Sequence, residues 1–151
     1  MERGKQRAVL VTGGAGYIGS HAAKALKASG FLPVVFDNLS SGHREAVQWG
    51  PLVHGDIRDA AALTEAMAAH EVCAVLHFAG LIEVGRSIGR PDVFWDVNVR
   101  GTAQVLAAMR ATGVDRLVFS SSAAVYGQAG RSPLETIRED AAKSQIGRAH
   151  V

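Results

Sequence analysis

The feature that most constrains the fold is a glycine-spaced segment close to the start of the chain. The aliphatic and β-branched run Val9–Thr12 leads directly into three glycines at the spacing Gly13-x-x-Gly16-x-x-Gly19. A helical pattern follows, with apolar residues every four positions at Ile18, Ala22 and Leu26. A strand, a glycine-rich turn and a helix in this order form the phosphate-binding opening of a βαβ unit.

Each glycine has a physical role in such a unit. One makes the tight turn, one lets the backbone approach a pyrophosphate, and one lets the helix pack closely on the strand. The first turn of the helix then presents unpaired N–H groups and the positive end of its dipole to the anion. A glycine-rich turn can also be only a tight connection, so the interpretation depends on a second feature.

That second feature is an acid at the end of the next predicted strand. Pro33–Phe36 has strand character and ends at Asp37, eighteen positions after Gly19. An acid about twenty residues beyond the glycines can accept hydrogen bonds from the adenosine ribose hydroxyls. The same carboxylate would repel a 2′-phosphate, and the next residue is Asn38 rather than Arg. The sequence therefore predicts a dinucleotide site that favours NAD over NADP.

Size and composition indicate one globular domain. The chain has 151 residues, of which 48% are hydrophobic, enough to bury a core and too many for a disordered chain. No apolar run is long enough to span a bilayer, and residues 1–7 are expected to be a polar leader rather than a signal peptide. The net charge of +2, with acids and bases interleaved, makes nucleic acid an unfavourable partner.

The number of cysteines bears on disulfides, metal sites and the redox environment of the protein. Cys73 is the only cysteine, which excludes an internal disulfide and a thiol metal site. A reducing, cytoplasmic location fits, with Cys73 as a small buried hydrophobe. No spacing of His, Cys, Asp and Glu suggests a metal ligand set.

The rest of the chain alternates strand and helix signals. Further strands are predicted at 52–54, 74–78 and 116–119, and helices at about 43–48, after Asp59 as N-cap, and from Pro91 to Gly113. Apolar strands joined by helices imply right-handed crossovers and a parallel sheet covered on both faces. We expect an α/β fold with a Rossmann-type doubly wound parallel sheet in the order 3-2-1-4-5. The cofactor should lie across the carboxyl ends of the strands, where the order reverses.

Motifs along nearly the whole chain resemble one family, the extended short-chain dehydrogenase/reductases. They keep the family's order and spacing at Thr12–His21, Asp37–Leu39, Gly55–Arg58, His77–Leu81, Val84–Gly85, Asn98–Thr102 and Phe119–Gly127. Within the family, the combination of Tyr17–His21, Phe78–Leu81 and Val84–Gly85 is most similar to the 4-epimerases of UDP-sugars.

The resemblance assigns roles to residues of the adenosine half of the site. It implies that Tyr17 and Ile18 supply backbone amides to the pyrophosphate. Asp37 and Asn38 would hold the adenosine ribose. The pair Asp56 and Ile57 would flank the adenine, although Asp56 also fits as a turn acid.

For the nicotinamide half, the resemblance implies a segment that passes under the cofactor, consisting of Phe78, Ala79 and Gly80. Asn98 would project toward the cofactor from the long helix, unless it is a mid-helix polar residue facing water. Ser122 matches the catalytic serine that hydrogen-bonds the reacting sugar hydroxyl, although three serines after a strand also fit a loop. His77 is expected to be a satisfied core residue or to face the cofactor.

The chemistry implied by the resemblance is an oxidation and its reversal on one bound UDP-sugar. A tyrosine base takes the C4 hydroxyl proton while hydride passes to NAD, and hydride then returns to the other face of the 4-keto sugar. The family's Tyr-x-x-x-Lys pair does not occur here, because Tyr126 is followed four places on by Gly130 and Tyr17 by His21. The intact enzyme is expected to be a homodimer that pairs through the long helix.

The missing pair leads to an expectation about domain organisation. Residues 8–144 are expected to be an incomplete NAD-binding domain, truncated before the last strand and the substrate domain. Residues 145–151 are expected to be a non-native tail. Such a chain should have no epimerase activity and weak NAD affinity.

Two other function classes remain open. One is another nucleotide-sugar enzyme of the same family, such as a dehydratase or decarboxylase. A dehydratase should carry an acid soon after its serine, whereas Ala123 and Ala124 follow Ser122. The other class is a non-catalytic NAD-binding regulator, which would lack the Tyr-x-x-x-Lys pair at any length.

Overall fold

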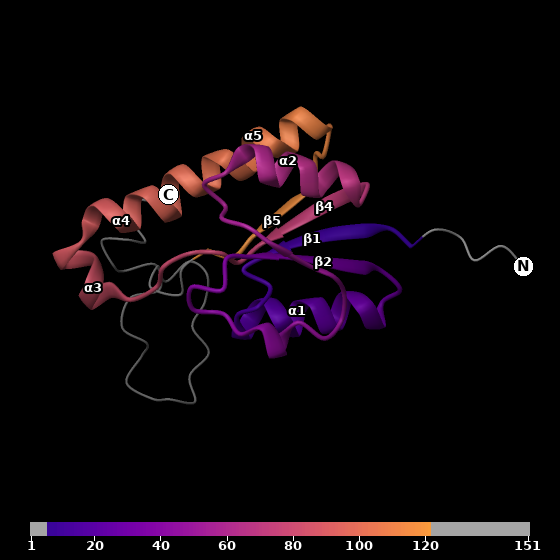
Figure 1. The fold of residues 1–151 in the computed structure, drawn as a ribbon, viewed down its shortest axis with the longest axis horizontal. Helices are drawn as coiled ribbons and strands as arrows, with labels where there is room; N and C mark the ends of the chain where they lie inside the picture. The colour runs from indigo at the N-terminus through magenta and orange to yellow at the C-terminus, as the bar shows by residue number, and fades with distance from the viewer. Residues whose placement is uncertain (1–5, 122–151) are drawn as a thin grey trace, which may run out of the picture. The chain divides into compact units, whose positions relative to one another are not determined.

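A five-stranded parallel sheet forms the centre of the fold in the computed structural model, which describes residues 6–121 (Figure 1). Its strands are β1 (Ala8–Thr12), β2 (Leu32–Asp37), β3 (Leu52–His54), β4 (Val72–His77) and β5 (Leu117–Phe119). Their order is β3-β2-β1-β4-β5, and every neighbouring pair is parallel. The predicted fold class and strand order are confirmed, and the predicted strand limits differ by at most two residues.

Helices cover both faces of this sheet. The described helices are α1 (Tyr17–Ala28), α2 (Ala60–Ala69), α3 (Val84–Gly89), α4 (Pro91–Trp95) and α5 (Thr102–Thr112), of which α3 and α4 lie beyond the ends of the strands (Figure 1). Helix α1 contacts β1 and β2 from one face, whereas α2 and α5 pack together over the other (Figure 1). Within residues 6–121 no helix has both the length and the apolar character needed to cross a membrane.

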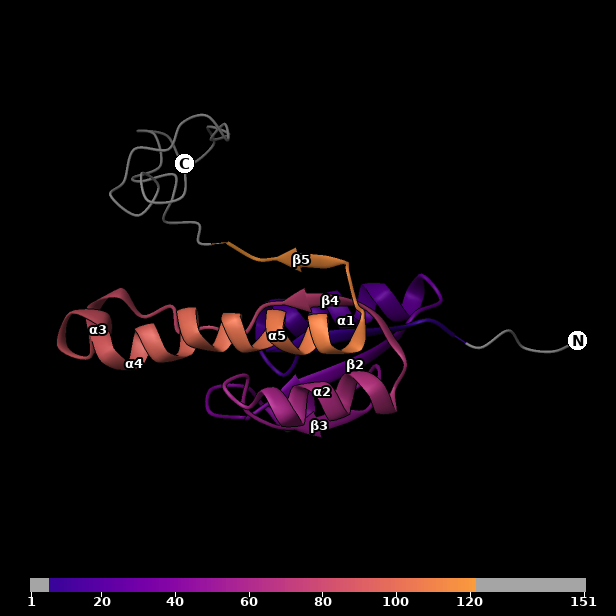
Figure 2. The same cartoon turned by 90° about the horizontal axis from the view of Figure 1, so that it is seen from above.

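The predicted long helix is present, although it is not uniform. It starts at α4 with Pro91 in its first turn, continues through a π-helical segment at Asp96–Gly101, and ends after α5 at Gly113 (φ +72°). Figure 2 shows α4 and α5 end to end along the sheet, with β5 at the sheet's edge. Helix α3 was not predicted, and the predicted helix near 43–48 is only a 3-10 turn at Arg44–Ala46.

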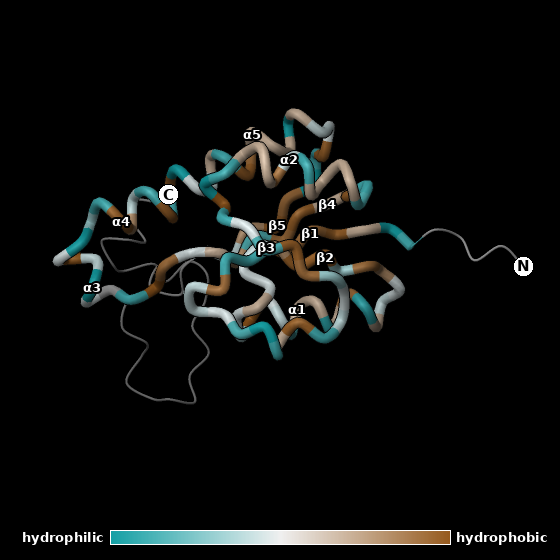
Figure 3. The backbone as a smooth tube through the Cα atoms, viewed as in Figure 1, coloured by the Kyte–Doolittle hydropathy of each residue, from teal (hydrophilic) through white to brown (hydrophobic). Residues whose placement is uncertain are grey.

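The hydrophobic core lies between the sheet and the α2–α5 layer. Alternate strand residues face this layer, where they meet one apolar side of α2 and of α5. The buried members from the strands are Leu10, Val34, Phe36 and Val75, and those from the helices are Leu63, Met67, Val105 and Met109. Figure 3 shows the same separation, with hydrophobic strands inside and hydrophilic segments on the helices.

The predicted apolar stripe of α1 is wrong at Ile18, which is 60% exposed. The buried residues of this helix are Gly19 and Ala23. A Cβ atom at Gly19 would lie 2.2 Å from the carbonyl oxygen of Gly13, so the helix meets the preceding turn through its smallest residue. This close approach turns Ile18 outward.

Candidate functional site

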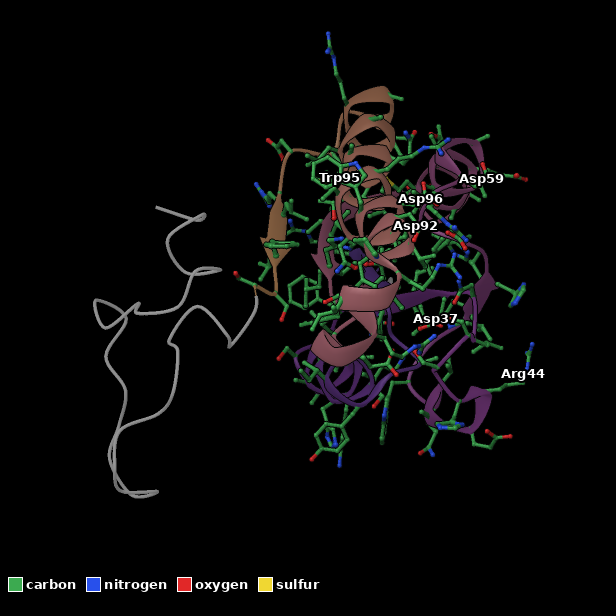
Figure 4. All side chains as sticks on the ribbon, turned by 90° about the vertical axis from the view of Figure 1, so that its left-hand side faces the viewer. Asp37, Arg44, Asp59, Asp92, Trp95 and Asp96 are labelled. Atoms are coloured by element: carbon green, nitrogen blue, oxygen red, sulfur yellow. The ribbon has the colours of Figure 1, made fainter. Side chains whose placement is uncertain are left out.

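Three buried polar or charged side chains occur in the described residues, and each ends a strand. Thr12 is the last residue of β1, Asp37 of β2 and His77 of β4. Carboxyl ends of parallel strands meet at one edge of the sheet, where the strand order reverses between β1 and β4. Figure 4 looks at this edge and shows Asp37 near its centre, below Asp92 and Asp96 of the long helix.

The glycine turn after β1 is held from two sides. Gly13 has a φ of +70°, and its amide donates to the Phe36 carbonyl at 3.0 Å. A Cβ atom on Gly13 would lie 2.6 Å from the Ala79 nitrogen, so the turn also packs against the backbone that follows β4. A side chain at Gly13 would therefore separate the two loops that border the crevice.

The start of α1 is suited to an anion. Gly16 is the N-cap and supplies no side-chain hydrogen bond, and the first turn of α1 carries no acidic side chain. The first N–H groups of a helix have no intrahelical acceptor, so here they remain available to a ligand. Tyr17 and Ile18, the first two residues of α1, are 82% and 60% exposed, so their side chains do not cover this end of the helix. This geometry fits a pyrophosphate.

Asp37 is fixed in place by the glycine turn and by its own loop. Its Oδ2 accepts from the Ala15 amide at 3.0 Å, and its Oδ1 accepts from the Leu39 amide at 2.8 Å. Only 9% of the residue is exposed. Each carboxylate oxygen has a second lone pair, so Asp37 can still accept from two ligand hydroxyls. A vicinal diol on a ribose has that pattern of donors.

Asp56 belongs to an ion-pair network in which Arg58 links the loop after β3 to the long helix. Arg58 donates to both of its oxygens, at 2.9 Å from Nε and 2.7 Å from Nη2, and also pairs with Asp96 at 2.8 Å. The Asn38 amide donates to Asp56 at 3.0 Å. The hydrogen bonds from Arg58 lower the pKa of Asp56 and, in turn, the two carboxylates raise the pKa of Arg58.

Ile57 follows Asp56, and its side chain points away from the surface. Its side chain is in the core, 6% exposed, and a Cβ atom on Gly101 would lie 2.7 Å from its Cδ1. The long helix therefore approaches Ile57 through a glycine. Any contact that Ile57 makes with an adenine must come from its backbone.

The segment after β4 is held at both ends. The Phe78 amide donates to the Thr12 carbonyl at 3.0 Å. At the other end, Asn98 accepts from the Leu81 amide at 2.8 Å and donates to the Leu81 carbonyl at 2.9 Å. Asn98 therefore does not face water, as one alternative had it, because both ends of its amide bind this loop. Gly80 between them is exposed.

His77 connects these elements below the surface. It is 1% exposed, its Nδ1 lies 2.5 Å from Thr12 Oγ1, and its Nε2 lies 3.0 Å from Thr102 Oγ1. Burial lowers the pKa of His77 to about 4, so the ring is neutral at physiological pH. The prediction of a satisfied core histidine is confirmed, although Thr102 was not predicted as its partner.

The predicted catalytic serine, Ser122, lies outside the described residues. Sequence reasoning also missed Arg58 and Asp96 as partners of Asp56, although Arg58 stands two residues after it. Within the described part of the chain, no group of three or more His, Cys, Asp or Glu residues is placed to hold a metal ion.

Sequence comparison relates this chain to enzymes of one family. The NAD dependent epimerase/dehydratase family matches residues 9–149. The UDP-glucose 4-epimerase of Rhizobium leguminosarum bv. trifolii is 51% identical over 140 residues, which cover 93% of this chain and 43% of that protein. The chain therefore spans less than half of the length of this curated relative.

Solved structures agree with the sequence comparison. A crystal structure of UDP-glucose 4-epimerase from Brucella ovis in complex with NAD matches with a TM-score of 0.78 and 50% identity, over 84% of this chain and 39% of that one. The UDP-glucose 4-epimerase from Bifidobacterium longum in complex with NAD+ and UDP matches with a TM-score of 0.74 and 34% identity, over 80% and 38%.

Proposed function

Because the chain belongs to the NAD dependent epimerase/dehydratase family, we propose that it is the NAD-binding part of a UDP-glucose 4-epimerase. The observation that carries this proposal is Asp37, which is buried at the end of β2 and oriented by the Ala15 and Leu39 amides. Its free lone pairs suit the two ribose hydroxyls of NAD, and its charge disfavours the 2′-phosphate of NADP.

The other residues of the crevice have matching tasks. The backbone amides of Tyr17 and Ile18, with the turn of Gly13, Gly16 and Gly19, hold the pyrophosphate. Asn38, Asp56 and the backbone of Ile57 border the adenosine. The pair formed by Asn98 and Leu81 holds the segment Phe78, Ala79 and Gly80 beneath the nicotinamide side of the site.

The substrate proposed for the whole protein is a UDP-sugar, because related epimerases have been solved with UDP and with UDP-glucose. When bound, NAD supplies a reversible hydride acceptor for C4 of the sugar. Ser122, which follows β5, is proposed to hydrogen-bond the reacting hydroxyl. These assignments follow from the matching motifs and are open to substitution experiments.

We also propose that the intact enzyme is a homodimer that pairs through its long helix. Trp95, Val99 and Leu106 are 67%, 45% and 49% exposed along this helix. Figure 4 shows Trp95 on the side of the helix toward β5, away from Asp92 and Asp96. An aromatic and aliphatic strip of this kind is typical of homodimer interfaces.

Calorimetric titration of the purified chain with NAD and with NADP tests the cofactor proposal. We expect Asp37→Ala to weaken NAD binding at least about tenfold, since a hydrogen bond to a charged group contributes about 1.5–3 kcal/mol. The matched control is Asp59→Ala, which removes an acid at the N-terminus of α2 and should leave the affinity unchanged. Equal affinity of the Asp37→Ala variant and the parent chain for NAD would contradict the proposal.

Activity is tested with a chimera. Residues 1–144 would replace the corresponding segment of the Rhizobium leguminosarum enzyme, to which the chain is 51% identical. We expect the chimera to interconvert UDP-galactose and UDP-glucose, and to lose this activity with Ser122→Ala. A folded chimera that binds UDP but does not turn over either sugar would refute the assignment.

A further inference from the structure

The donor and the acceptor of each hydrogen bond around His77 follow from its neighbours. A carbonyl oxygen can only accept, so the Thr102 hydroxyl, 2.6 Å from the Asn98 carbonyl oxygen, must donate to it. The Thr102 oxygen must then accept from His77 Nε2, which places the proton of the imidazole on Nε2. The remaining nitrogen, Nδ1, is an acceptor in the neutral ring, so the Thr12 hydroxyl donates to it.

These contacts close a ring through the polypeptide. From His77 they pass to Thr102 and then to the backbone of Asn98, and the Asn98 side chain holds both backbone groups of Leu81. Leu81 is four residues after His77. The three residues before Leu81 are therefore tied at one end to β1 and at the other to the π-helical segment 96–101.

These hydrogen bonds hold the π-helical segment of the long helix in place. The Thr102 hydroxyl bonds the carbonyl four residues earlier. His77 Nε2, at the end of β4, donates a second hydrogen bond to the oxygen of this hydroxyl, and so ties the helix to the sheet at the residue next to the segment. Asn98 lies inside the segment, so its orientation depends on where this turn is held.

We propose that His77 is a positioning residue which, as a neutral imidazole protonated on Nε2, fixes the π-helical segment and through Asn98 holds the loop of residues 78–81. The last step, that this loop supports NAD, rests on the proposed function. The effect on the loop itself does not.

Hydrogen exchange of the Leu81 amide measures the effect on the loop directly. Thr102→Val removes the hydroxyl with little change of shape, whereas Thr102→Ser keeps it. Thr112→Val is a matched control, because Thr112 makes the same kind of bond to Ala108 at 2.9 Å in the same helix. Exchange is measured by NMR and compared with the amides of β1, which report global unfolding.

We expect the Leu81 amide to exchange about tenfold faster in Thr102→Val, the change for a loss of about 1.4 kcal/mol. In Thr102→Ser and Thr112→Val its rate should stay near that of the parent chain. Unchanged protection of Leu81 in Thr102→Val, or an equal loss in Thr112→Val, would overturn the proposal.

Two substitutions of His77 test the roles of its two ring nitrogens separately. Gln can place its amide nitrogen where His77 Nε2 lies, and Asn can place its amide oxygen where Nδ1 lies. His77→Gln should therefore keep more of the Leu81 protection than His77→Asn, and the reverse order would contradict the direction of bonding. If neither variant folds, the Thr102 pair decides the question alone.

NAD affinity then tests the last step. Thr102→Val should weaken NAD binding several-fold, while Thr112→Val should not. If the parent chain does not bind NAD, the proposed function fails while the Leu81 measurement still judges the role of His77. If NAD binds equally well to both valine variants although Leu81 is deprotected only in Thr102→Val, the loop is positioned by His77 without serving the cofactor, and the last step is refuted.

Discussion

Substitution of Gly19 by alanine tests the close contact between the glycine turn and α1. The added Cβ atom would lie 2.2 Å from the Gly13 carbonyl oxygen and 2.7 Å from the Gly14 Cα. An ordinary contact begins near 3.4 Å, so helix and turn must separate by more than 1 Å. Both neighbouring atoms belong to the backbone, which cannot rotate away as a side chain can.

The expected loss follows from two opposing terms. Overpacking costs about 1–3 kcal/mol, and the higher helix propensity of alanine returns at most about 1 kcal/mol. Because the obstacle is backbone, we expect the upper end of the cost and a net loss of about 2 kcal/mol. Gly85 in α3 is the matched control, since an added Cβ atom there meets nothing within 4 Å. Gly85→Ala should stabilise the chain by about 0.5–1 kcal/mol.

Urea unfolding followed by circular dichroism measures both changes. The two substitutions are chemically identical and both lie in helices, so opposite signs isolate the close contact from helix propensity. NAD titration should show weaker binding for Gly19→Ala and no change for Gly85→Ala. If Gly19→Ala is as stable as the parent chain, the contact is softer than its geometry implies and the argument for a required glycine fails.

Three further predictions concern charged and polar groups. The pKa of His77 is about 4 in the fold, against an ordinary value of 6.5 for histidine. The unfolded chain therefore binds more protons than the folded chain between pH 6.5 and pH 4, and the free energy of unfolding should fall by about 2 kcal/mol from pH 7 to pH 5. Urea unfolding of His77→Gln at several pH values should show no such fall. An equal fall in this variant would refute the lowered pKa of His77. Arg58→Met should raise the pKa of Asp56 toward its ordinary value in an NMR titration, because Arg58 is the main cause of the lowering, while stability changes by less than about 1 kcal/mol. Asp59→Ala should cost about 1 kcal/mol in thermal unfolding, since Asp59 accepts from the Ala61 and Ala62 amides; an unchanged midpoint would show that water replaces the cap.

Local signals in the sequence were sufficient for the sheet. Each strand is a short apolar run ended by a turn residue, and a doubly wound parallel arrangement then allows few orders. The N-cap at Asp59 and the end of the long helix at Gly113 also follow from local chemistry, because capping depends on neighbouring residues. These features need no knowledge of distant contacts.

The side-chain directions and partners that were not predicted depend on contacts between residues far apart in the sequence. The outward direction of Ile18 results from the packing of Gly19 on Gly13, which helical periodicity does not reveal. The core position of Ile57 depends on Gly101, 44 residues later in the chain. The partner of His77 is Thr102, 25 residues away, and no spacing rule connects a strand end with the middle of a later helix.

The position of β1 in the sheet has a consequence for synthesis of the chain. β1 comes first in the sequence and lies in the middle of the sheet, where Ala8 pairs with Leu32 of β2 and with Val72 of β4. Closing the connection between β1 and β4 costs about 0.9 kcal/mol more chain entropy than closing the one between β1 and β2. The β1–α1–β2 unit should therefore assemble first. The other edge of β1, the apolar run Ala8–Val11, then stays open until β4 ends, 40 residues after the end of β2, which takes about 2 to 8 seconds at usual rates of translation. An unpaired apolar edge is a template for pairing with other chains, so this interval is when a nascent chain would benefit most from a chaperone.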